Sequence, residues 1–265
     1  MLKHVILTRF LKNKLAAIGF CLLIIFVLAA IFAPFLSGYG RDTIDLMNIE
    51  SQPSLRHLFG TDELGRDVFT RLLYGGRISL GIAVSATVLQ LLIGVTLGCI
   101  SGFYGGWIDN AIMRIVDTIM CFPFFVIAIT VAALAGPSVW NVILIIGLLQ
   151  WTGVARIVRA EILSIKQSEF IEAARAMGLN SFEIIINHLL PNTLSPVIVN
   201  ATLAVAQGIL MEAGLSFLGL GVKQPEPSWG IYYQQLKVCV YCNMNGGFGF
   251  LQEYWYSYQF YQLIL

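Results

Sequence analysis

The sequence predicts an all-α protein that crosses a membrane several times, and composition, hydropathy and segment length carry this prediction. Of its 265 residues, 57% are hydrophobic and only 12% are charged, and the mean hydropathy is +0.78. A water-soluble domain usually has about 25% charged residues, so this chain has too little polar surface to dissolve as a globule. Apolar runs of about 20 residues, long enough to cross a hydrocarbon core as helices, recur along it.

Five apolar runs have the length of a transmembrane helix. They are residues 15–36, 78–102, 115–135, 139–157 and 194–220. The first run follows a basic stretch, as the apolar core of a secretory signal does, but such cores have only about 7–15 residues. We therefore expect a retained helix there. The fifth run is interrupted by Pro196 and several glycines, which packing against neighbouring helices makes tolerable in a bilayer.

Basic residues set the expected orientation. Lys and Arg gather before the first span, in residues 3–14, and again after the fourth, in residues 156–175. Cytoplasmic ends of spans carry such an excess, and the number of crossings between the two clusters agrees with one shared side. The N-terminus and the segment 158–191 are therefore predicted to be cytoplasmic, and the connection 37–77 is predicted to lie outside.

The polar segment 158–191 interrupts the apolar runs and contains the signals of a short helix. Ser168 is a suitable N-cap for a helix that runs to Met177, and Gly178 is placed as the left-handed residue that ends it. One face of this helix is predicted to carry a stripe of mainly small side chains. The stripe consists of Phe170, Ala173, Ala174 and Met177.

A second short helix is predicted directly after the first. Asn180, with Glu183 three positions later, matches the capping-box pattern, and Pro191 is expected to end the helix. Two alternatives exist for the two-helix unit: it rests on lipid headgroups, or it docks in a groove of a cytoplasmic partner. Docking is favoured, because alanines permit close backbone approach and because the flanking charges are mixed rather than basic.

Motifs in this segment resemble those of a known family. The stretch "EAARAMG" followed by "HLLPN" is similar to the EAA loop of bacterial ABC-importer permeases. The matching residues are Glu172, Ala173, Ala174, Gly178, Leu190 and Pro191. The stretches "FGTDELGRDVFTRLLYGGRISL" (59–80) and "EAGLSFLGLGVKQPEPSWG" (212–230) resemble the peptide and nickel branch, specifically the second permease of each pair, the dipeptide-permease C type. Together the motifs cover nearly all of residues 1–230.

The resemblance implies a type I ABC-importer permease fold in the inner membrane of a bacterial cell. It also implies partners: a homologous permease subunit in a heterodimer, two cytoplasmic ATP-binding subunits, an extracytoplasmic solute-binding protein and membrane lipid. The segment 158–191 would be the coupling loop, which docks on the ATP-binding subunits. The substrate would be a dipeptide, an oligopeptide or a related solute such as nickel, and it would cross by alternating access.

The family pattern fails after residue 230. We expect residues 1–77 to hold the first helix and an external loop, residues 78–230 to form the permease core, and residues 231–265 to replace the sixth helix. Of these last 35 residues, 11 are aromatic, and Tyr and Gln are too frequent for a clean span. We interpret the tail as a degraded or missing sixth helix that follows a frameshift. In one alternative the chain is therefore a non-functional remnant.

Enzyme activity is not expected. The sequence contains no G-x-x-x-x-G-K-[ST] phosphate-binding loop, and neither a nucleophile triad nor a metal cluster is recognisable. We therefore expect no catalytic residue, no metal site, no cofactor and no nucleic-acid partner. A secondary transporter, the main alternative class, needs ion-coupling acids near mid-bilayer, and only Glu212 comes close. A non-transporting membrane scaffold is a third class.

Polar residues inside the predicted spans are candidates for the substrate path or for helix packing. They are Gln90, Gln150, Asn200, Gln207 and Glu212. Intramembrane amides commonly bond neighbouring helices, so packing is the favoured alternative for the four amides. Glu212 is a costly acid near the end of the fifth span, and we expect it to orient a turn rather than to contact substrate. A charge cluster before or within the third span is expected to brace the coupling loop: Asp109, Arg114 and Asp117.

Overall fold

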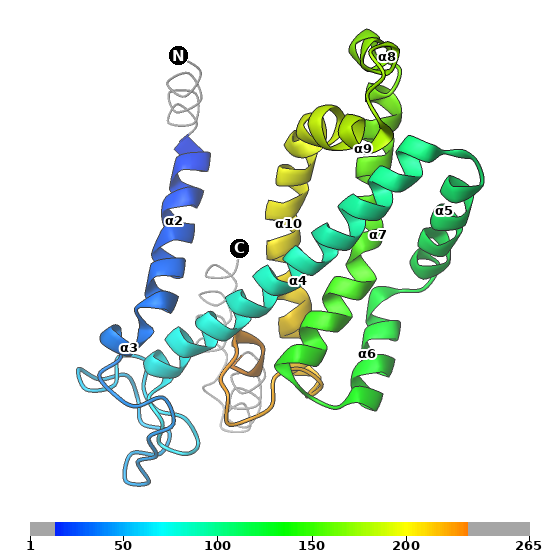
Figure 1. Ribbon diagram of the computed structural model, residues 1–265. Coiled ribbons are helices and arrows are strands. Elements are labelled where there is room, and N and C mark those ends of the chain that lie inside the picture. The colour runs from blue at the N-terminus through cyan, green and yellow to red at the C-terminus, as the bar shows by residue number, and fades with distance from the viewer. Residues whose placement is uncertain (1–13, 233–265) are drawn as a thin grey trace. The chain divides into compact units, whose positions relative to one another are not determined.

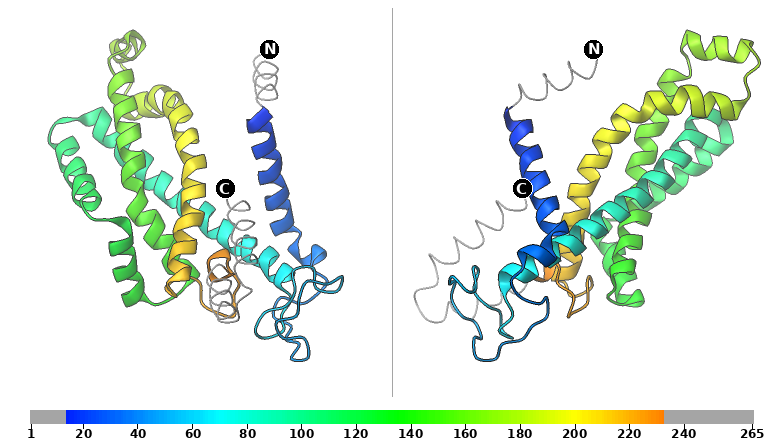
Figure 2. Two further views of the ribbon diagram at one scale, coloured as in Figure 1. Left: turned by 180° about the vertical axis from the view of Figure 1, so that it is seen from behind. Right: turned by 60° about the vertical axis from the view of Figure 1, so that its left-hand side comes forward.

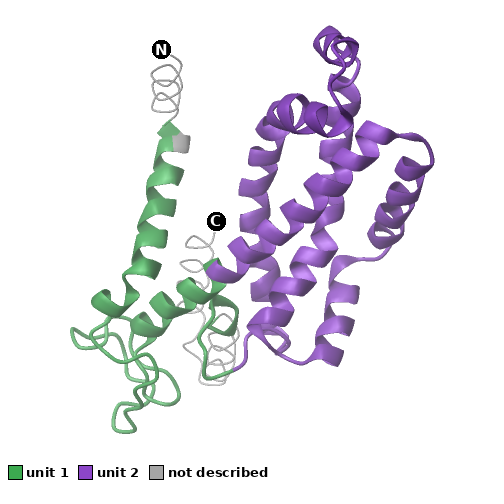
Figure 3. Ribbon diagram, in the orientation of Figure 1, with its two compact units in different colours: residues 1–80, 224–265 green, residues 81–223 purple. Residues whose placement is uncertain are grey.

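The computed structural model describes residues 14–232, which belong to two compact units (Figure 1). One unit takes its residues from 1–80 and 224–265, and the other comprises residues 81–223 (Figure 3). Apart from an isolated antiparallel bridge between Thr61 and Asp67, the regular structure of the described residues is helical. The prediction of an all-α protein is therefore confirmed for this part of the chain.

The helices follow one another from α2 to α10. They are α2 (Lys14–Ile31), α3 (Ala33–Leu36), α4 (Val68–Tyr104), α5 (Gly106–Met120), α6 (Phe124–Ala135), α7 (Val139–Ile165), α8 (Glu169–Ala176), α9 (Ser181–Ile184), the π-helix η1 (Ile185–Leu189) and α10 (Leu190–Phe217). Of the tail 231–265, only Ile231 and Tyr232 are described. The interpretation of the tail as a degraded sixth helix thus lies outside the described residues and stays a prediction.

Three helical segments of the described chain are long and apolar enough to cross a membrane: Val68–Tyr104, Val139–Ile165 and Ser181–Phe217. The bent pair α5 and α6 gives a fourth if it forms one span. Five clear spans are therefore not confirmed. The first predicted span corresponds to α2, of which Ala17–Ile31 counts as a shorter apolar helix. In contrast, α4 has 37 residues and is about 55 Å long, which exceeds the hydrocarbon core of about 30 Å.

The third predicted span, residues 115–135, is broken rather than straight. The axes of α5 and α6 differ by 83°, and residues 121–123 form the break. Pro123 has no backbone N–H to donate, and its ring disfavours helical backbone at Phe122. Hydropathy alone predicted one helix here, because the apolar run continues through the break.

In the unit of residues 81–223, α4 packs closely on α7, and α10 lies alongside α7 (Figure 2). Gly94, Gly98 and Gly102 recur at every fourth residue and therefore share one face of α4. A Cβ atom added to them would lie 2.6 Å from Val154 Cβ, 2.7 Å from the Ala155 carbonyl oxygen and 2.9 Å from Ile162 Cγ2, respectively. Such distances are too short for real Cβ atoms, so glycine permits this approach, as in other small-xxx-small helix interfaces.

In the other unit, a buried arginine joins three separate parts of the chain. Arg71, near the start of α4, is fully buried. Its guanidinium donates to the Asp42 carboxylate at 3.2 Å and to the Pro225 carbonyl oxygen at 3.1 Å. Its Nε atom donates to the hydroxyl of Tyr232. Because a buried charge must be paired, these bonds tie the segments before α4 and after residue 223 to α4 itself.

Candidate functional site

The helices α8, α9 and η1 connect α7 to α10 and form the candidate site (Figure 1). The connections between them are short: residues 166–168 precede α8, and residues 177–180 separate α8 from α9. The motif residues are distributed over all parts of this segment. Glu172, Ala173 and Ala174 lie on α8, Gly178 lies in the turn, and Leu190 and Pro191 begin α10.

The turn after α8 is built around Gly178, whose φ of +84° lies in the left-handed region that glycine adopts without steric cost. The N–H of Gly178 donates to the Arg175 carbonyl oxygen at 3.0 Å, and the N–H of Leu179 donates to that of Ala174 at 3.2 Å. This pair of bonds is a Schellman motif. Gly178 therefore ends α8, as the sequence predicts.

The start of α8 differs from the prediction in one respect. Ser168 holds the N-cap position with extended backbone, but its side chain makes no capping bond to α8. Its hydroxyl instead donates to the carbonyl oxygen of Ile165 at 2.6 Å. With only three residues between α7 and α8, the hydroxyl satisfies one of the last carbonyls of α7, which lack partners inside that helix.

Asn180 and Glu183 form the predicted capping box at the start of α9. The side-chain oxygen of Asn180 accepts from the Glu183 N–H at 2.9 Å, and the Glu183 carboxylate accepts from the Asn180 N–H at 3.0 Å. The prediction that Pro191 ends this helix is wrong. The chain continues through η1 into α10, and Pro191 lies in the first turn of α10, directly after the wider turn of η1. The π-helical turn accommodates the proline without ending the helix.

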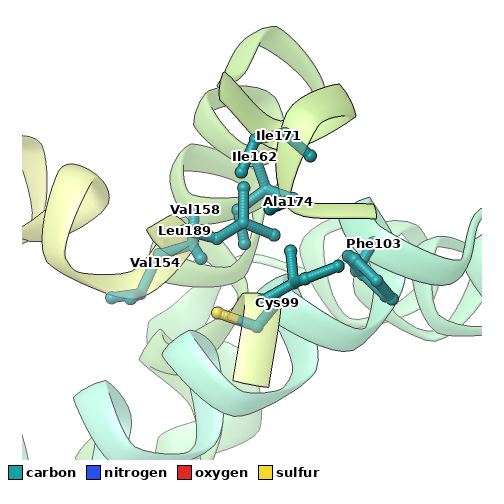
Figure 4. Close-up of a cluster of buried hydrophobic side chains, with 9 residues drawn as sticks. Cys99, Phe103, Val154, Val158, Ile162, Ile171, Ala174 and Leu189 are labelled. Atoms are coloured by element: carbon teal, nitrogen blue, oxygen red, sulfur yellow. The ribbon is translucent and has the colours of Figure 1, made fainter. Parts of the chain in front are cut away.

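Four buried side chains anchor the site to the rest of its unit (Figure 4). Ile171 and Ala174 come from α8, Ile184 from α9 and Leu189 from η1, and none is more than 2% exposed. They pack against Cys99 and Phe103 of α4 and Val154, Val158 and Ile162 of α7. Fully burying an isoleucine or leucine side chain stabilises by about 1.5–3 kcal/mol, so Ile171, Ile184 and Leu189 hold the site firmly against the ends of α4 and α7.

Four large apolar side chains of the same segment are exposed, and we call this set the outer face. It consists of Phe170, Met177, Phe182 and Ile186, whose exposed fractions are 46%, 74%, 71% and 43%. The predicted stripe on α8 is thus divided, because Ala174 is buried whereas Phe170, Ala173 and Met177 are exposed. The inward contact comes from Ile171, three positions before Ala174, and this pair turns Phe170 outward.

Exposed charged side chains lie on the same helices as the outer face, and acids predominate. Glu169, Glu172 and Glu183 are exposed, and Arg175 is the exposed base on α8. Arg175 Cζ also lies 5.9 Å from the centre of the Phe103 ring in the last turn of α4. Lys166 Nζ approaches the same ring at 5.7 Å and donates to the Phe103 carbonyl oxygen. The site therefore combines an apolar outer face, an acidic rim and cationic contacts to α4.

The predicted charge cluster of α5 pairs with α7 just before the site. Both oxygens of Asp109 accept from Arg159, at 2.5 and 2.6 Å, and Asp117 pairs with Arg156 at 2.5 Å. Bidentate pairing of this kind is the strongest form of the arginine–carboxylate contact. Arg114, the third member of the predicted cluster, is exposed and joins no ion pair in the described part of the chain.

The polar span residues are scattered rather than gathered at one place. Gln90 is buried, Gln150 and Asn200 are half-buried, and Gln207 is exposed. Glu212 is fully buried and accepts from the Ser216 hydroxyl at 2.6 Å. No group of three or more His, Cys, Asp or Glu side chains among residues 14–232 is placed to hold a metal ion.

Glu212 is linked through Ser216 to the turn that follows α10. The Ser216 hydroxyl that donates to Glu212 also accepts from the Val222 N–H at 3.2 Å. A Cβ atom added to Gly221 would lie 2.1 Å from this hydroxyl oxygen, so the turn closes tightly on Ser216. This arrangement agrees with the expectation that Glu212 orients a turn, whereas a role in the substrate path stays a prediction.

Two features of the site were not predicted from the sequence. The first is the glycine repeat of α4, which the four-residue spacing of Gly94, Gly98 and Gly102 would have indicated. The second is the role of Phe103 between two cations. No sequence signal marks Phe103, because Lys166 and Arg175 are more than 60 residues away along the chain.

Two family models match the chain. Residues 94–251 match "Binding-protein-dependent transport system inner membrane component", and residues 3–53 match "N-terminal TM domain of oligopeptide transport permease C". The first match continues beyond residue 230, where the sequence predicts that the family pattern ends. It also contains the whole candidate site.

Curated relatives resemble the chain over most of its length. A "Dipeptide transport system permease protein DppC" from Alkalihalophilus pseudofirmus is 44% identical over 83% of this chain and 72% of its own. The Bacillus subtilis protein of the same name is 43% identical over 84% and 70%, respectively. The "Oligopeptide transport system permease protein OppC" from Bacillus subtilis is 41% identical, covering 84% of this chain and 73% of its own.

Solved structures resemble the fold at low sequence identity. A chain of the methionine ABC transporter MetNI in an inward-facing conformation gives a TM-score of 0.55 at 18% identity, covering 73% of this chain and 91% of its own. A second crystal form gives a TM-score of 0.51 at 21% identity, covering 73% and 94%. These likenesses identify the fold as that of an ABC-transporter chain.

Proposed function

Since this chain belongs to the family of binding-protein-dependent transport system inner membrane components, we propose that it is the membrane subunit through which an ATP-driven importer moves peptides. The family comprises transport permeases, not enzymes. The peptide assignment rests on relatives at 41–44% identity whose names specify dipeptide or oligopeptide transport. A related small solute such as nickel is the alternative substrate. Alternating access between the two sides of the membrane is the proposed mechanism.

The proposed assembly contains a homologous permease subunit, two cytoplasmic ATP-binding subunits and an extracytoplasmic solute-binding protein. In this assembly the N-terminus and the candidate site face the cytoplasm of a bacterial cell, in line with the basic residues at 3–14 and 156–175. The residues proposed to couple ATP hydrolysis to transport are Glu172, Ala173, Ala174, Gly178, Leu190 and Pro191. Gln90, Gln150, Asn200, Gln207 and Glu212 remain candidates for the substrate path or for helix packing.

The observation that carries the proposal is the outer face, a set of exposed apolar side chains on α8, α9, η1 and the turn after α8, a segment that buried side chains anchor to α4 and α7. Phe170, Met177 and Phe182 are 46–74% exposed, while the opposite side of the same helices is buried. A lipid surface is a poorer occupant than a protein groove, because the cytoplasmic leaflet is anionic and the rim of the outer face is acidic. A groove of an ATP-binding subunit would cover the apolar side chains and transmit its movement through the buried anchors.

Purification of the tagged chain from its native membrane in a mild detergent tests this proposal. We expect a second permease and an ATP-binding subunit to co-purify with the wild type. Glu172→Arg reverses an exposed charge beside the outer face and should abolish recovery of the ATP-binding subunit. Glu50→Arg is the matched control, since it reverses an exposed acid on the segment between α3 and α4, where the proposed topology puts no ATP-binding subunit.

The outcomes separate the possible explanations. Loss of the ATP-binding subunit with both variants would indicate general misfolding, and no loss with Glu172→Arg would contradict docking through α8. If the wild type recovers no partner, replacing the tail by an apolar span of about 20 residues and repeating the experiment tests whether the tail blocks assembly. The family match does not favour a secondary transporter, and uptake that depends on ATP and a binding protein would exclude it.

A further inference from the structure

Phe103 lies where three elements of the 81–223 unit meet. Its ring, in the last turn of α4, is only 8% exposed and belongs to the buried cluster that includes Ile171 and Ala174 of α8 (Figure 4). Lys166 Nζ, at the end of α7, lies 5.7 Å from the ring centre. Arg175 Cζ, on α8, lies 5.9 Å from it. One aromatic ring therefore contacts the end of α7 and the helix that carries the outer face.

These contacts constrain the orientation of the end of α4 relative to α7 and α8. A cation within about 6 Å of an aromatic ring is attracted to the face of the ring, so the contact depends on orientation, unlike apolar burial. Lys166 also donates to the carbonyl oxygen of Phe103, which is one of the last carbonyls of α4. A cation is favoured at that end by the helix dipole. Lys166 and Arg175 thus hold α4 from two neighbouring elements.

The path of the chain determines how a displacement of α8 can reach the other helices. Residues 166–168 connect α7 to α8 directly, and η1 passes without a break into α10. The end of α4 has no such connection, because the chain reaches α8 from α4 only through α5, α6 and α7. A displacement of α8 can therefore reach α4 directly only through side-chain contacts.

We infer that Phe103 and Arg175 are positioning residues that transmit the movement of α8 to α4 during transport. The inference rests on the proposed function, because it requires an ATP-binding subunit that moves the outer face. Ile171 and Ala174 keep α8 in contact with α4 but permit sliding, since apolar burial is non-directional. The cation–ring contacts oppose sliding. Their loss should leave docking of the ATP-binding subunit on the outer face intact, but it should reduce the displacement of α4 that each ATP-driven movement of α8 produces.

The test uses the complete importer in proteoliposomes, with the partner permease, the ATP-binding subunits and the solute-binding protein. Uptake of labelled alanyl-alanine and hydrolysis of ATP are measured in the same vesicles. Phe103→Leu removes the ring but keeps an apolar side chain, and Arg175→Gln removes the charge. The double variant tests whether the two residues act through one contact, and Arg175→Lys restores a cation. Arg114→Gln is the matched control, because Arg114 is an exposed arginine outside the buried cluster of Phe103 and, unlike Asp109 and Asp117, forms no ion pair with α7 in the described residues.

We expect Phe103→Leu and Arg175→Gln each to lower the dipeptide moved per ATP by about two- to fivefold. The double variant should lose no more than the worse single variant, Arg175→Lys should recover most of the ratio, and Arg114→Gln should match wild type. The amount of ATP-binding subunit recovered should not change. An unchanged ratio in both single variants, multiplying losses in the double variant, or loss of the ATP-binding subunit would overturn the inference. Absence of ATP-dependent uptake in the wild type would overturn the proposed function itself, and the inference with it.

Discussion

Replacing Gly98 by alanine tests the close packing of α4 on α7. A Cβ atom at this position would lie 2.7 Å from the carbonyl oxygen of Ala155 and 2.9 Å from Cβ of Val158. Neither atom is at the end of a flexible side chain, so the two helices would have to separate. Overpacking of this kind costs about 1–3 kcal/mol. The higher helix propensity of alanine offsets about 1 kcal/mol, so we expect a net loss of stability of up to about 2 kcal/mol.

The matched control for this prediction is Gly153→Ala in α7. A Cβ atom there would have no heavy atom within 4 Å, so only the gain in helix propensity remains. We expect a stabilisation of up to about 1 kcal/mol. Unfolding in mixed micelles, titrated with a denaturing detergent and followed by tryptophan fluorescence, measures both variants against wild type. Equal stability of the two variants would refute the close approach of α4 and α7 that Gly98 is argued to permit.

Two further predictions concern the turn of the candidate site and the unit formed by residues 1–80 and 224–265. Asn180→Ala removes the capping bond to the Glu183 N–H, so we expect a loss of about 1 kcal/mol and faster limited proteolysis within residues 177–180. Unchanged proteolysis would contradict the role of the capping box. Burial raises the pKa of the Tyr232 phenol, so its contribution to stability is complete below pH about 10 and is lost as pH rises further. Tyr232→Phe should therefore lose less stability than wild type between pH about 9 and about 11, and equal losses would contradict burial of this phenol.

Features that depend on neighbouring residues in the chain could be predicted from the sequence. The capping box of Asn180 and Glu183 and the left-handed Gly178 each need only residues within one helical turn. The family motif around Glu172 is equally local. These signals correctly predicted a helix, a tight turn and a second helix start between α7 and α10.

Features that depend on distant residues were predicted poorly. The inward face of α8 is determined by Ile171 fitting against α4 and α7, and the sequence of α8 alone permits either face. Pro191 is a helix-ending signal, but η1 changes the helix register and puts it in a first turn. Hydropathy likewise counts residues 115–135 as one span, because apolar content is insensitive to the break at Pro123. Local preference is overridden by packing at Ile171 and by backbone geometry at Pro191, whereas at Pro123 the local preference of proline prevails over the apolar pattern.

If the proposed function holds, the arrangement of caps and anchors accounts for a polar segment built into an apolar chain in this way. A surface that receives a mechanical stroke transmits it only if the structure behind it does not yield. Between α7 and α10, seven residues lie outside helices, in the connections 166–168 and 177–180. The first connection is fixed by Ser168 and Lys166, and the second by the Schellman bonds and the capping box. Four buried anchors then keep the helices against α4 and α7, and the contacts of Phe103 with Lys166 and Arg175 oppose sliding, so we expect a force on Met177 or Phe182 to displace membrane helices rather than to bend the loop.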